Sequence, residues 1–234
     1  GVVISISNQT QIKNKKIKSI QIFSNYLLIK KNIKFLEWVS SYNLIPRGLV
    51  LRMILPKSQG YFMKDDDSKN FQELLSPKYL KLNETQSKAR AKIERIFLQN
   101  DYSTILLDGM PGSGKTEVYF DLIAKNISRK KQSLILFPEV SLTNEFIKRV
   151  EERFGCAPDI WHSKITPAKK RKIIERVISG KSQILIGARS ALFLPFKNLG
   201  LLIVDEEHDS SYKQEEKGIY NARAVSYTHL TLPT

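Results

Sequence analysis

The chain contains one complete phosphate-binding pattern, GxxxxGK[ST], at Gly109-Met110-Pro111-Gly112-Ser113-Gly114-Lys115-Thr116. The glycines let the backbone turn with its N–H groups directed at phosphate oxygens, Lys115 would reach the β and γ phosphates, and Thr116 would bind Mg²⁺. A β-favouring run, Ser103–Leu107, precedes the loop, and helical spacing follows it over Glu117–Asn126. A glycine-rich turn that arose by chance would not need a strand before it and a helix after it. The sequence therefore predicts a strand, a loop and a helix that bind ATP and Mg²⁺.

An acidic motif further along the chain completes this prediction. Asp205-Glu206-Glu207-His208 follows the apolar run Leu201–Val204, and open α/β sheets place their ligands beyond the carboxyl ends of strands. Asp205 would hold Mg²⁺, Glu206 would orient or deprotonate the attacking water, and His208 would sense the γ-phosphate. Alone, this tetrapeptide also fits a solvated acidic loop. Together with the phosphate loop, it predicts a nucleotide hydrolase.

Strand-like and helix-like segments alternate around these motifs. A helix is expected from Asn83 to Gln99, another ends at Phe154, and a third runs from Pro167, after Thr166, to Gly180. Continuous apolar runs that favour buried strands occupy Leu134–Phe137, Ile184–Gly187 and Leu201–Val204. Such alternation predicts an α/β fold, a RecA-like parallel sheet with helices on both faces.

The N-terminal part has a different pattern. Apolar and polar residues alternate over Val2–Ser7 and again near Ile17–Ile22, which predicts paired strands. Apolar residues at helical spacing over Ile33–Tyr42 and Leu49–Leu55 predict two short helices across a turn. The two helices fit a small winged-helix or helix-turn-helix module, and they equally fit a helical hairpin without DNA contacts. A polar, punctuated connector is expected over 57–81.

Composition limits the class of protein. The 234 residues include 38 Lys and Arg against 23 Asp and Glu, a net charge of +15, which suits a polyanionic partner such as DNA. Lysine-rich usage without any binding role is the alternative. Cys156 is the only cysteine, which excludes an intrachain disulfide and a thiolate zinc cluster. No apolar run approaches the roughly 18 residues that span a bilayer, so a cytoplasmic location is expected.

The order of motifs resembles that of superfamily two helicases with a DExH-type (DEAH) box, and the details resemble the PriA family of replication-restart helicases. The stretches that carry this resemblance are Gly109–Tyr119, Pro138–Thr143, His162-Ser163, Gly187–Phe193 and Asp205–Glu216. The resemblance implies four segments: the end of a β-rich domain that binds a DNA 3′ end (1–31), a winged-helix-like DNA-binding module with a linker (32–76), a RecA-like ATP-binding lobe (77–225) and an off-pattern tail (226–234).

The resemblance also implies roles for individual residues. Gln86 would contact adenine, and Glu117 would adjoin the nucleotide with the phosphate loop. The residues expected to contact DNA are Pro138, Glu139, Ser141, Thr143, His162, Ser163, Arg189, Ser190, Tyr212 and Lys213. Tyr212 and Lys213 would belong to an aromatic-rich loop that couples DNA occupancy to hydrolysis, because a ring can stack on a base while a lysine meets phosphate.

At the level of function, the resemblance implies an ATP-dependent 3′ to 5′ DNA helicase that acts at stalled replication forks. Its implied partners are forked and single-stranded DNA, single-stranded DNA-binding protein and other primosome proteins. The family also has a second RecA-like lobe and a zinc module, neither of which is in this sequence, so the chain alone is expected to hydrolyse ATP weakly. A DNA-binding adaptor switched by nucleotide, without productive hydrolysis, is the alternative, and a P-loop kinase is a weaker one.

Overall fold

The computed structural model describes residues 29–54, 81–98, 102–138, 143–214 and 220–229. The helices are α1 (Lys30–Tyr42), α2 (Arg47–Ile54), α3 (Glu84–Leu98), α4 (Lys115–Ser128), α5 (Asn144–Phe154), α6 (Pro167–Ser179) and α7 (Ala222–His229), with short 3-10 turns η2 (Arg189–Phe193) and η3 (Ser210–Tyr212). The strands predicted within 2–22 and the connector predicted over 57–81 lie outside the described residues. Within these ranges, every helix is too short or too polar to cross a membrane.

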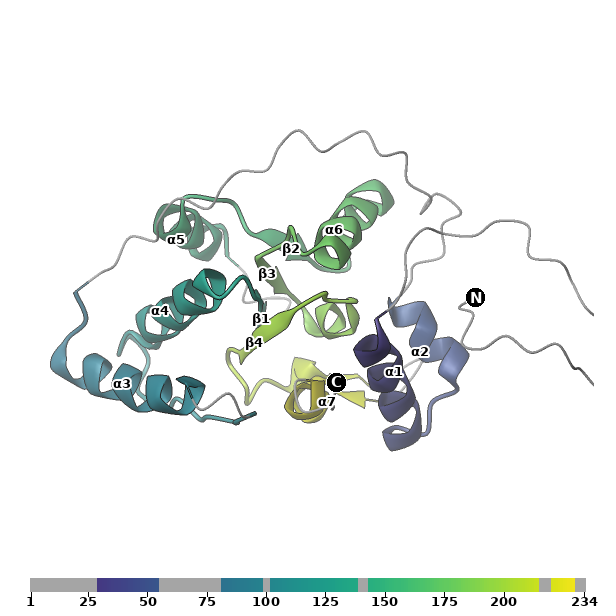
Figure 1. Cartoon of the computed structure of the whole chain (residues 1–234), viewed down its shortest axis with the longest axis horizontal. Helices are drawn as coiled ribbons and strands as arrows, with labels where there is room; N and C mark the ends of the chain where they lie inside the picture. Colours follow the sequence, from purple (N-terminus) through teal and green to yellow (C-terminus); the bar gives the residue numbers. More distant parts are fainter. Residues whose placement is uncertain (1–28, 55–80, 99–101, 139–142, 215–219, 230–234) are drawn as a thin grey trace, which may run out of the picture.

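A parallel sheet forms the centre of the chain (Figure 1). Its strands are β1 (Gln132–Leu136), β2 (Asp159–Trp161), β3 (Ile184–Gly187) and β4 (Leu199–Val204), in the spatial order β2-β3-β1-β4. β1 pairs with β3 on one side and with β4 on the other, all in parallel. A separate antiparallel ribbon pairs β5 (Lys213–Gln214) with β6 (Tyr220–Asn221). The predicted α/β fold with a parallel sheet is confirmed.

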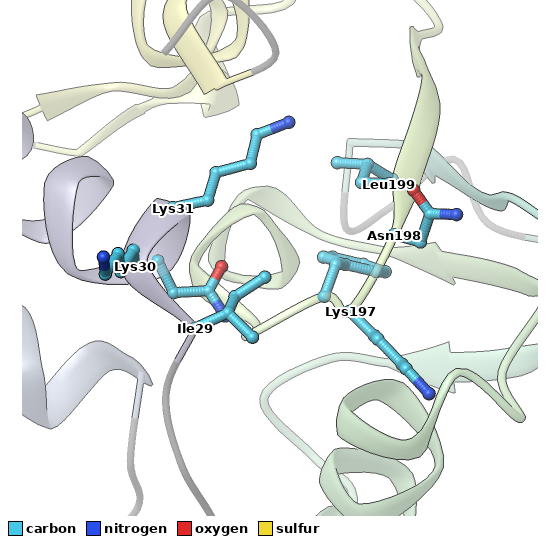
Figure 2. Close-up of a pocket in the computed structure, with 8 residues that line it drawn as sticks. Ile29, Lys30, Lys31, Lys197, Asn198 and Leu199 are labelled. Carbon is cyan, nitrogen blue, oxygen red and sulfur yellow. The ribbon is translucent and has the colours of Figure 1, made fainter. Parts of the chain in front are cut away.

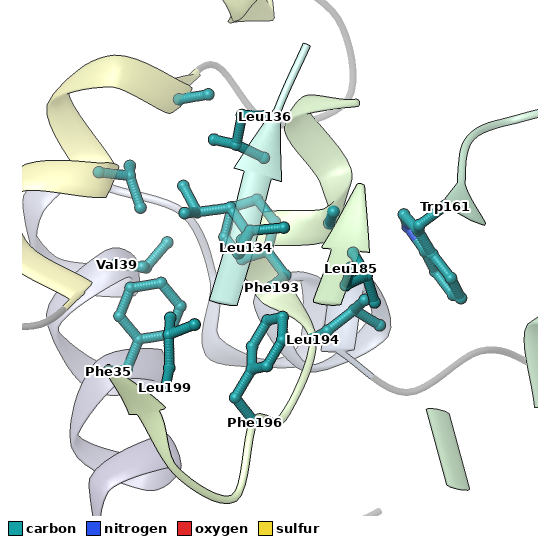
Figure 3. Close-up of a cluster of buried hydrophobic side chains, with 14 of the residues drawn as sticks. Phe35, Val39, Leu134, Leu136, Trp161, Leu185, Phe193, Leu194, Phe196 and Leu199 are labelled. Carbon is teal, nitrogen blue, oxygen red and sulfur yellow. The ribbon is translucent and has the colours of Figure 1, made fainter. Parts of the chain in front are cut away.

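Helices cover both faces of this sheet because its strands are apolar on both sides. Successive side chains of a strand point to opposite faces, so Leu134 and Leu136 of β1 join one hydrophobic cluster while Ile135 joins the other. The Ile135 cluster packs against α4 and α5. The Leu134 cluster packs against α1, α6, η2 and α7, and Figure 3 shows Phe35, Phe193 and Leu199 converging on Leu134. This double coverage is what a parallel sheet requires.

The predicted helix ends lie where local chemistry places them. Thr143 and Thr166 precede α5 and α6, and each side-chain oxygen accepts a hydrogen bond from the backbone N–H three residues later. Gly180 ends α6 with φ +80°, a left-handed conformation that glycine adopts with little strain. The predicted helix from Asn83 is also present, as α3.

The two N-terminal helices share the core of the sheet. Phe35, Leu36 and Val39 of α1 and Val50 of α2 are buried in the same cluster as Leu134. The Phe35 and Phe193 rings lie 6.1 Å apart between centroids. The predicted pair of short helices is therefore present. Both helices contribute side chains to the same hydrophobic core as the sheet.

The strand predicted before the phosphate loop is not formed. Residues Ser103–Leu107 have no strand assignment, and the side chains of Ile105 and Leu106 are 40% and 78% exposed. A strand exists only through hydrogen bonds to a neighbour, and β4, the outer strand of the sheet, pairs only with β1 among the described strands. Only Leu107 of this run packs inward, against Ile93, Val118 and Leu122. β propensity alone did not decide its conformation.

Candidate nucleotide site

The phosphate loop turns sharply into α4. The Ser113 N–H donates to the Met110 carbonyl at 3.1 Å, and Gly112 and Gly114 have φ values of +77° and +80°, where only glycine is free of strain. A Cβ on Gly114 would also overlap the Gln86 side-chain amide. α4 begins at Lys115, so the loop leads into a helix N-terminus, whose free N–H groups and dipole favour anions.

Lys115 lies over the loop that it is predicted to serve. Its Nζ donates to the Gly109 carbonyl at 2.5 Å and lies 3.3 Å from the Met110 carbonyl. These neutral acceptors are weaker partners than a phosphate, because hydrogen bonds between two charged groups are the strong ones. Among the described residues, the lysine therefore has no carboxylate partner that a phosphate would have to displace.

Asp205 stands at the end of β4, as the sequence predicts. Its backbone N–H donates to the Leu136 carbonyl at 3.0 Å, which extends the β1–β4 pairing by one residue. Its Oδ1 accepts from the Glu206 N–H at 2.9 Å. The carboxylate is thereby fixed at the carboxyl edge of the sheet.

Tyr119 joins this carboxylate to the phosphate-loop helix. The Tyr119 hydroxyl donates to Asp205 Oδ2 at 3.0 Å. Tyr119 lies one turn after Thr116 on α4, so this hydrogen bond ties the helix that carries one predicted Mg²⁺ ligand to the other, Asp205. The phosphate loop and the acidic motif lie on the same side of the molecule, as a shared ligand requires.

Burial keeps the Tyr119 hydroxyl protonated. The side chain is 6% exposed, and burial, followed by the negative charge of Asp205, raises the pKa of Tyr119 well above its usual value. The hydroxyl therefore remains a donor to Asp205 over the whole range in which proteins are studied. Sequence reasoning missed this residue, although helical spacing from Thr116 places it on the same face of α4.

The other residues of the acidic motif lie at or near the surface. Glu206 is exposed and has φ +49°, a left-handed conformation that is uncommon outside glycine. Its Oε2 lies 3.5 Å from His208 Nε2, while Glu207 pairs with Arg223 at 2.7 Å. Glu206, predicted to orient or deprotonate the attacking water, and His208, the predicted γ-phosphate sensor, are therefore neighbours beside Asp205.

The donor set of this site fits Mg²⁺ held with a nucleotide. Within the described ranges, no three His, Cys, Asp or Glu side chains gather as a metal cluster. Thr116 and Asp205 instead offer one hydroxyl and one carboxylate, and Mg²⁺ is commonly held by one or two carboxylates together with waters and phosphate oxygens. The absence of an all-protein cage is therefore compatible with the predicted ligand.

Gln86 contacts the phosphate loop from α3. Its backbone N–H donates to Asn83 Oδ1 at 2.8 Å and its Oε1 accepts from the Asn83 N–H at 3.0 Å, a reciprocal cap of the helix start. Its Nε2 donates to the Ser113 carbonyl at 2.9 Å. The side chain is therefore at the nucleotide site, where the predicted adenine contact would place it.

Glu117, another predicted nucleotide neighbour, pairs with Arg149 of α5 at 2.8 Å. One turn further along α4, Asp121 forms a second set of ion pairs. Asp121 is buried between Arg90 of α3, at 3.2 Å, and Arg153 of α5. These pairs hold α3 and α5 against α4, which carries the phosphate loop at its start.

The Tyr212 ring, which the resemblance implies would stack on a DNA base, is buried in this structure. Its side chain is 2% exposed, and its hydroxyl donates to the carbonyls of Leu136 at 2.9 Å and Asp205 at 2.5 Å. A buried ring has no face open to a base. Tyr212 instead fixes the backbone beneath Asp205, because a buried hydroxyl and two backbone carbonyls satisfy one another there.

Arg189 is turned toward the same loop. Its Nη1 donates to the carbonyls of Ser211 at 2.7 Å and Lys213 at 2.6 Å. A DNA phosphate would have to compete with these acceptors for that nitrogen. Lys213, by contrast, is exposed.

Of the remaining residues predicted to contact DNA, Pro138 follows β1, His162 and Ser163 follow β2, and Ser190 follows β3. Pro138 is buried, Thr143 caps α5, and Ser190 accepts a hydrogen bond from Trp161 Nε1 at 3.2 Å. His162 Nδ1 accepts from the Lys164 N–H at 3.2 Å, and the Ser163 carbonyl accepts from Lys170 Nζ at 3.4 Å. Glu139 and Ser141 lie outside the described residues. Their DNA contacts stay predictions.

Comparison with known proteins identifies the class first. Residues 83–231 match the family described as DEAD/DEAH box helicase, and this stretch is more than half of the chain. The chain therefore belongs to the DEAD/DEAH box helicase family. Residues 1–56 match the 3′ DNA-binding domain, 3′BD, of PriA, and this match includes α1 and α2 and crosses the predicted boundary at residue 31.

The relatives then narrow the comparison to one protein. Replication restart protein PriA of Rickettsia conorii is 37% identical over 224 residues, which cover 95% of this chain and 33% of the relative. PriA of Haemophilus influenzae is 43% identical over 147 residues, covering 63% and 20%, and PriA of Bacillus subtilis is 39% identical over 147 residues, covering 63% and 18%. The chain thus spans about a third or less of these relatives. The resemblance to the PriA family is confirmed.

Proposed function

We propose that this chain supplies the ATP-binding lobe of a DNA helicase that moves 3′ to 5′ and restarts replication at stalled forks. The observation that carries the proposal is the hydrogen bond from Tyr119, on the helix that follows the phosphate loop, to Asp205. It brings the phosphate loop and the acidic motif to one edge of the sheet. Open α/β sheets bind their ligands at that edge.

Each residue of the site has a defined task in ATP hydrolysis. Lys115 and the loop N–H groups hold the β and γ phosphates, while Thr116 and Asp205 hold Mg²⁺, which neutralises charge on the phosphate oxygens. Glu206 orients a water and accepts its proton as the water oxygen bonds to the γ-phosphorus. The bond from that phosphorus to the β-γ bridging oxygen breaks, giving ADP and phosphate. His208, 3.5 Å from Glu206, senses the γ-phosphate in this proposal.

DNA is the proposed second ligand. The match of residues 1–56 to a 3′ DNA-binding domain and the net charge of +15 support it, because cationic surfaces gain free energy when counterions leave the phosphate backbone. Single-stranded DNA-binding protein and other primosome proteins are the proposed partners, and the cytoplasm is the proposed compartment. These proposals, and the family's zinc module, concern the whole protein, of which this chain matches only a part.

The experiment compares ATP hydrolysis with and without forked DNA in the full-length protein. We expect Lys115→Ala and Glu206→Gln each to lower DNA-stimulated turnover by on the order of 100-fold, because each removes a group that acts on developing charge or on the attacking water. Lys172→Ala, which removes an exposed lysine of α6, is the matched control and should retain turnover.

The same variants separate the two proposed functions. If the nucleotide only switches a DNA-binding adaptor, wild-type protein should bind ATP and forked DNA while DNA fails to stimulate hydrolysis, and Glu206→Gln should change nothing. Unchanged DNA-stimulated hydrolysis in both Lys115→Ala and Glu206→Gln would refute the assigned roles. Release of phosphate to water dismisses the kinase alternative.

A further inference from the structure

Arg189 holds the acidic loop, the segment from Asp205 to Gln214, from outside it. The residue begins η2 two positions after β3 ends, so it lies at the carboxyl edge of the sheet, where β4 also ends. Its Nη1 donates to the Ser211 carbonyl at 2.7 Å and to the Lys213 carbonyl at 2.6 Å. In the described part of the chain, no Asp or Glu pairs with Arg189. A guanidinium that stays charged is therefore held here by two neutral acceptors.

The same guanidinium lies near the antiparallel ribbon at the end of the acidic loop. Lys213 belongs to β5, and its neighbour Gln214 pairs with Tyr220 of β6. Burial raises the pKa of Tyr220 to about 12, and the positive charge of Arg189 opposes this rise, which places the guanidinium near the buried hydroxyl. Arg189 therefore anchors the end of the acidic loop between η2 and the ribbon.

The loop that Arg189 holds contains one strained residue. Asp205 itself is fixed by the hydroxyls of Tyr119 and Tyr212. Glu206, which follows it, is exposed and has φ +49°. A non-glycine residue keeps such a conformation only where the surrounding structure imposes it. Loosening the loop beyond Tyr212 would therefore let Glu206 change its backbone conformation while Asp205 stays in place.

A DNA phosphate is a stronger partner for Arg189 than the two carbonyls are. Hydrogen bonds between a guanidinium and a phosphate join two charged groups and are frequently bidentate. Other residues predicted to contact DNA, His162 and Ser163, follow β2 and lie at the same carboxyl edge. We propose that Arg189 restrains ATP hydrolysis in the absence of DNA, and that a DNA phosphate releases the acidic loop by drawing Arg189 away from the Ser211 and Lys213 carbonyls.

Release of the acidic loop lets Glu206 leave its left-handed conformation and orient the attacking water. Arg189 is thus a positioning residue, which acts on hydrolysis through Glu206. This regulation rests on the proposed function, in which Glu206 activates the water and DNA is the second ligand.

The test measures ATP hydrolysis by the full-length protein without DNA and at increasing concentrations of forked DNA. Arg189→Ala removes the restraint. Lys197→Ala is the control, because it removes one positive charge from the opposite edge of the same sheet, where Figure 2 shows Lys197 beside Asn198 and Leu199 at the start of β4. Amide hydrogen exchange over residues 209–214, with and without oligothymidine and in the absence of nucleotide, measures the hold on the loop directly. Urea denaturation reports whether both variants are folded.

Without DNA, Arg189→Ala should hydrolyse ATP about fivefold faster than wild type and Lys197→Ala, because two hydrogen bonds no longer hold the loop. DNA should stimulate this variant correspondingly less. Exchange over residues 209–214 should be fast in Arg189→Ala, whereas in wild type it should become fast only when oligothymidine is bound. A loss of protein structure would instead slow hydrolysis with and without DNA alike.

The outcomes separate this regulation from the proposed function. If DNA stimulates wild-type hydrolysis but Arg189→Ala without DNA is no faster than the control, the restraint by Arg189 is overturned and the proposed function stands. Wild-type exchange over 209–214 that oligothymidine leaves unchanged would overturn the restraint as well, even if Arg189→Ala failed to fold. Wild-type hydrolysis that DNA does not stimulate would overturn both.

Discussion

The two halves of the nucleotide site are held in different ways. The phosphate loop is exposed and rests on hydrogen bonds among exposed groups, from Gln86 to Ser113 and from Lys115 to Gly109. The acidic loop that follows β4 is fixed from inside, by the buried hydroxyls of Tyr119 and Tyr212. Exposed hydrogen bonds exchange readily with water, whereas buried ones are costly to leave unmade. The acidic half is therefore preorganised, and the phosphate loop is the half that a nucleotide can reshape.

The largest expected effect is on the acidic half of the site, which is held by buried side chains. Tyr212→Ala removes a ring of the main hydrophobic cluster and takes its hydroxyl donor from the Asp205 carbonyl, while the Leu136 carbonyl keeps the Asp205 N–H, so the free energy of unfolding should fall by about 3–5 kcal/mol. Urea denaturation of the full chain measures it. Tyr102→Ala, at an exposed tyrosine before the phosphate loop, is the control. A loss below about 1 kcal/mol would show that the acidic loop is not held from the core.

Alkaline pH should weaken the same half. Tyr220, in the ribbon that follows the acidic loop, is buried, and burial raises its pKa to about 12, against about 10 in the unfolded chain. Above pH 10 the unfolded state loses this proton first, so its stabilisation is complete below pH 10 and is lost as pH rises toward 12. Tyr119 and Tyr212, whose pKa values are also raised, act in the same direction.

The Tyr220 contribution should amount to about 2–3 kcal/mol between pH 10 and pH 12. Urea denaturation of wild type and Tyr220→Phe at pH 8, 10 and 11 measures it, and the variant should lose stability less steeply above pH 10. Parallel curves for the two proteins would exclude Tyr220 as a source of the alkaline loss.

Removal of the Tyr119 hydroxyl should have a smaller effect. Tyr119→Phe keeps the ring but removes the hydrogen bond to Asp205, at a cost of about 1 kcal/mol of stability. It should also weaken Mg²⁺-dependent ATP binding more than Mg²⁺-free binding, because Asp205, a predicted Mg²⁺ ligand, loses the donor that orients it. Titration with a fluorescent ATP analogue, with and without Mg²⁺, measures this. Tyr102→Phe is the matched control, and equal losses with and without Mg²⁺ would contradict a positioning role.

The exposed half should respond least in stability. Gln86→Ala removes exposed hydrogen bonds to Asn83 and Ser113, so the unfolding free energy should fall by less than about 1 kcal/mol. Amide hydrogen exchange should nevertheless accelerate over residues 109–114 and stay unchanged over 205–212. Lys88→Ala, on the exposed face of α3, is the control. Faster exchange in both segments would show that the two halves are one rigid unit.

Local chemistry made several elements predictable from the residues of each segment alone. The threonine and proline that open α6, the glycine at its end and the apolar runs of β1, β3 and β4 act within a few residues of chain. The position of Asp205 directly after β4, a half-buried strand at the edge of the sheet, also follows from such a run. These predictions were confirmed because a helix end or a buried strand depends mainly on its own residues.

The differences from expectation concern residues whose state depends on distant partners. Ser103–Leu107 has β-favouring residues but no neighbouring strand among those described. Tyr212 lies in a polar stretch, and its burial depends on carbonyls at Leu136 and Asp205. No local pattern indicates either outcome, because pairing and burial are made between segments far apart in sequence.

By itself, the amino-acid sequence determined that this chain has a phosphate loop, an acidic motif after a strand and an α/β alternation, since each depends on residue types at short, fixed spacing. Only the tertiary structure decided that Tyr119 links the two motifs, that Tyr212 faces inward and that Arg189 holds the acidic loop. The reason is physical: spacing along a chain sets local geometry, whereas burial and charge proximity arise only when distant segments pack together.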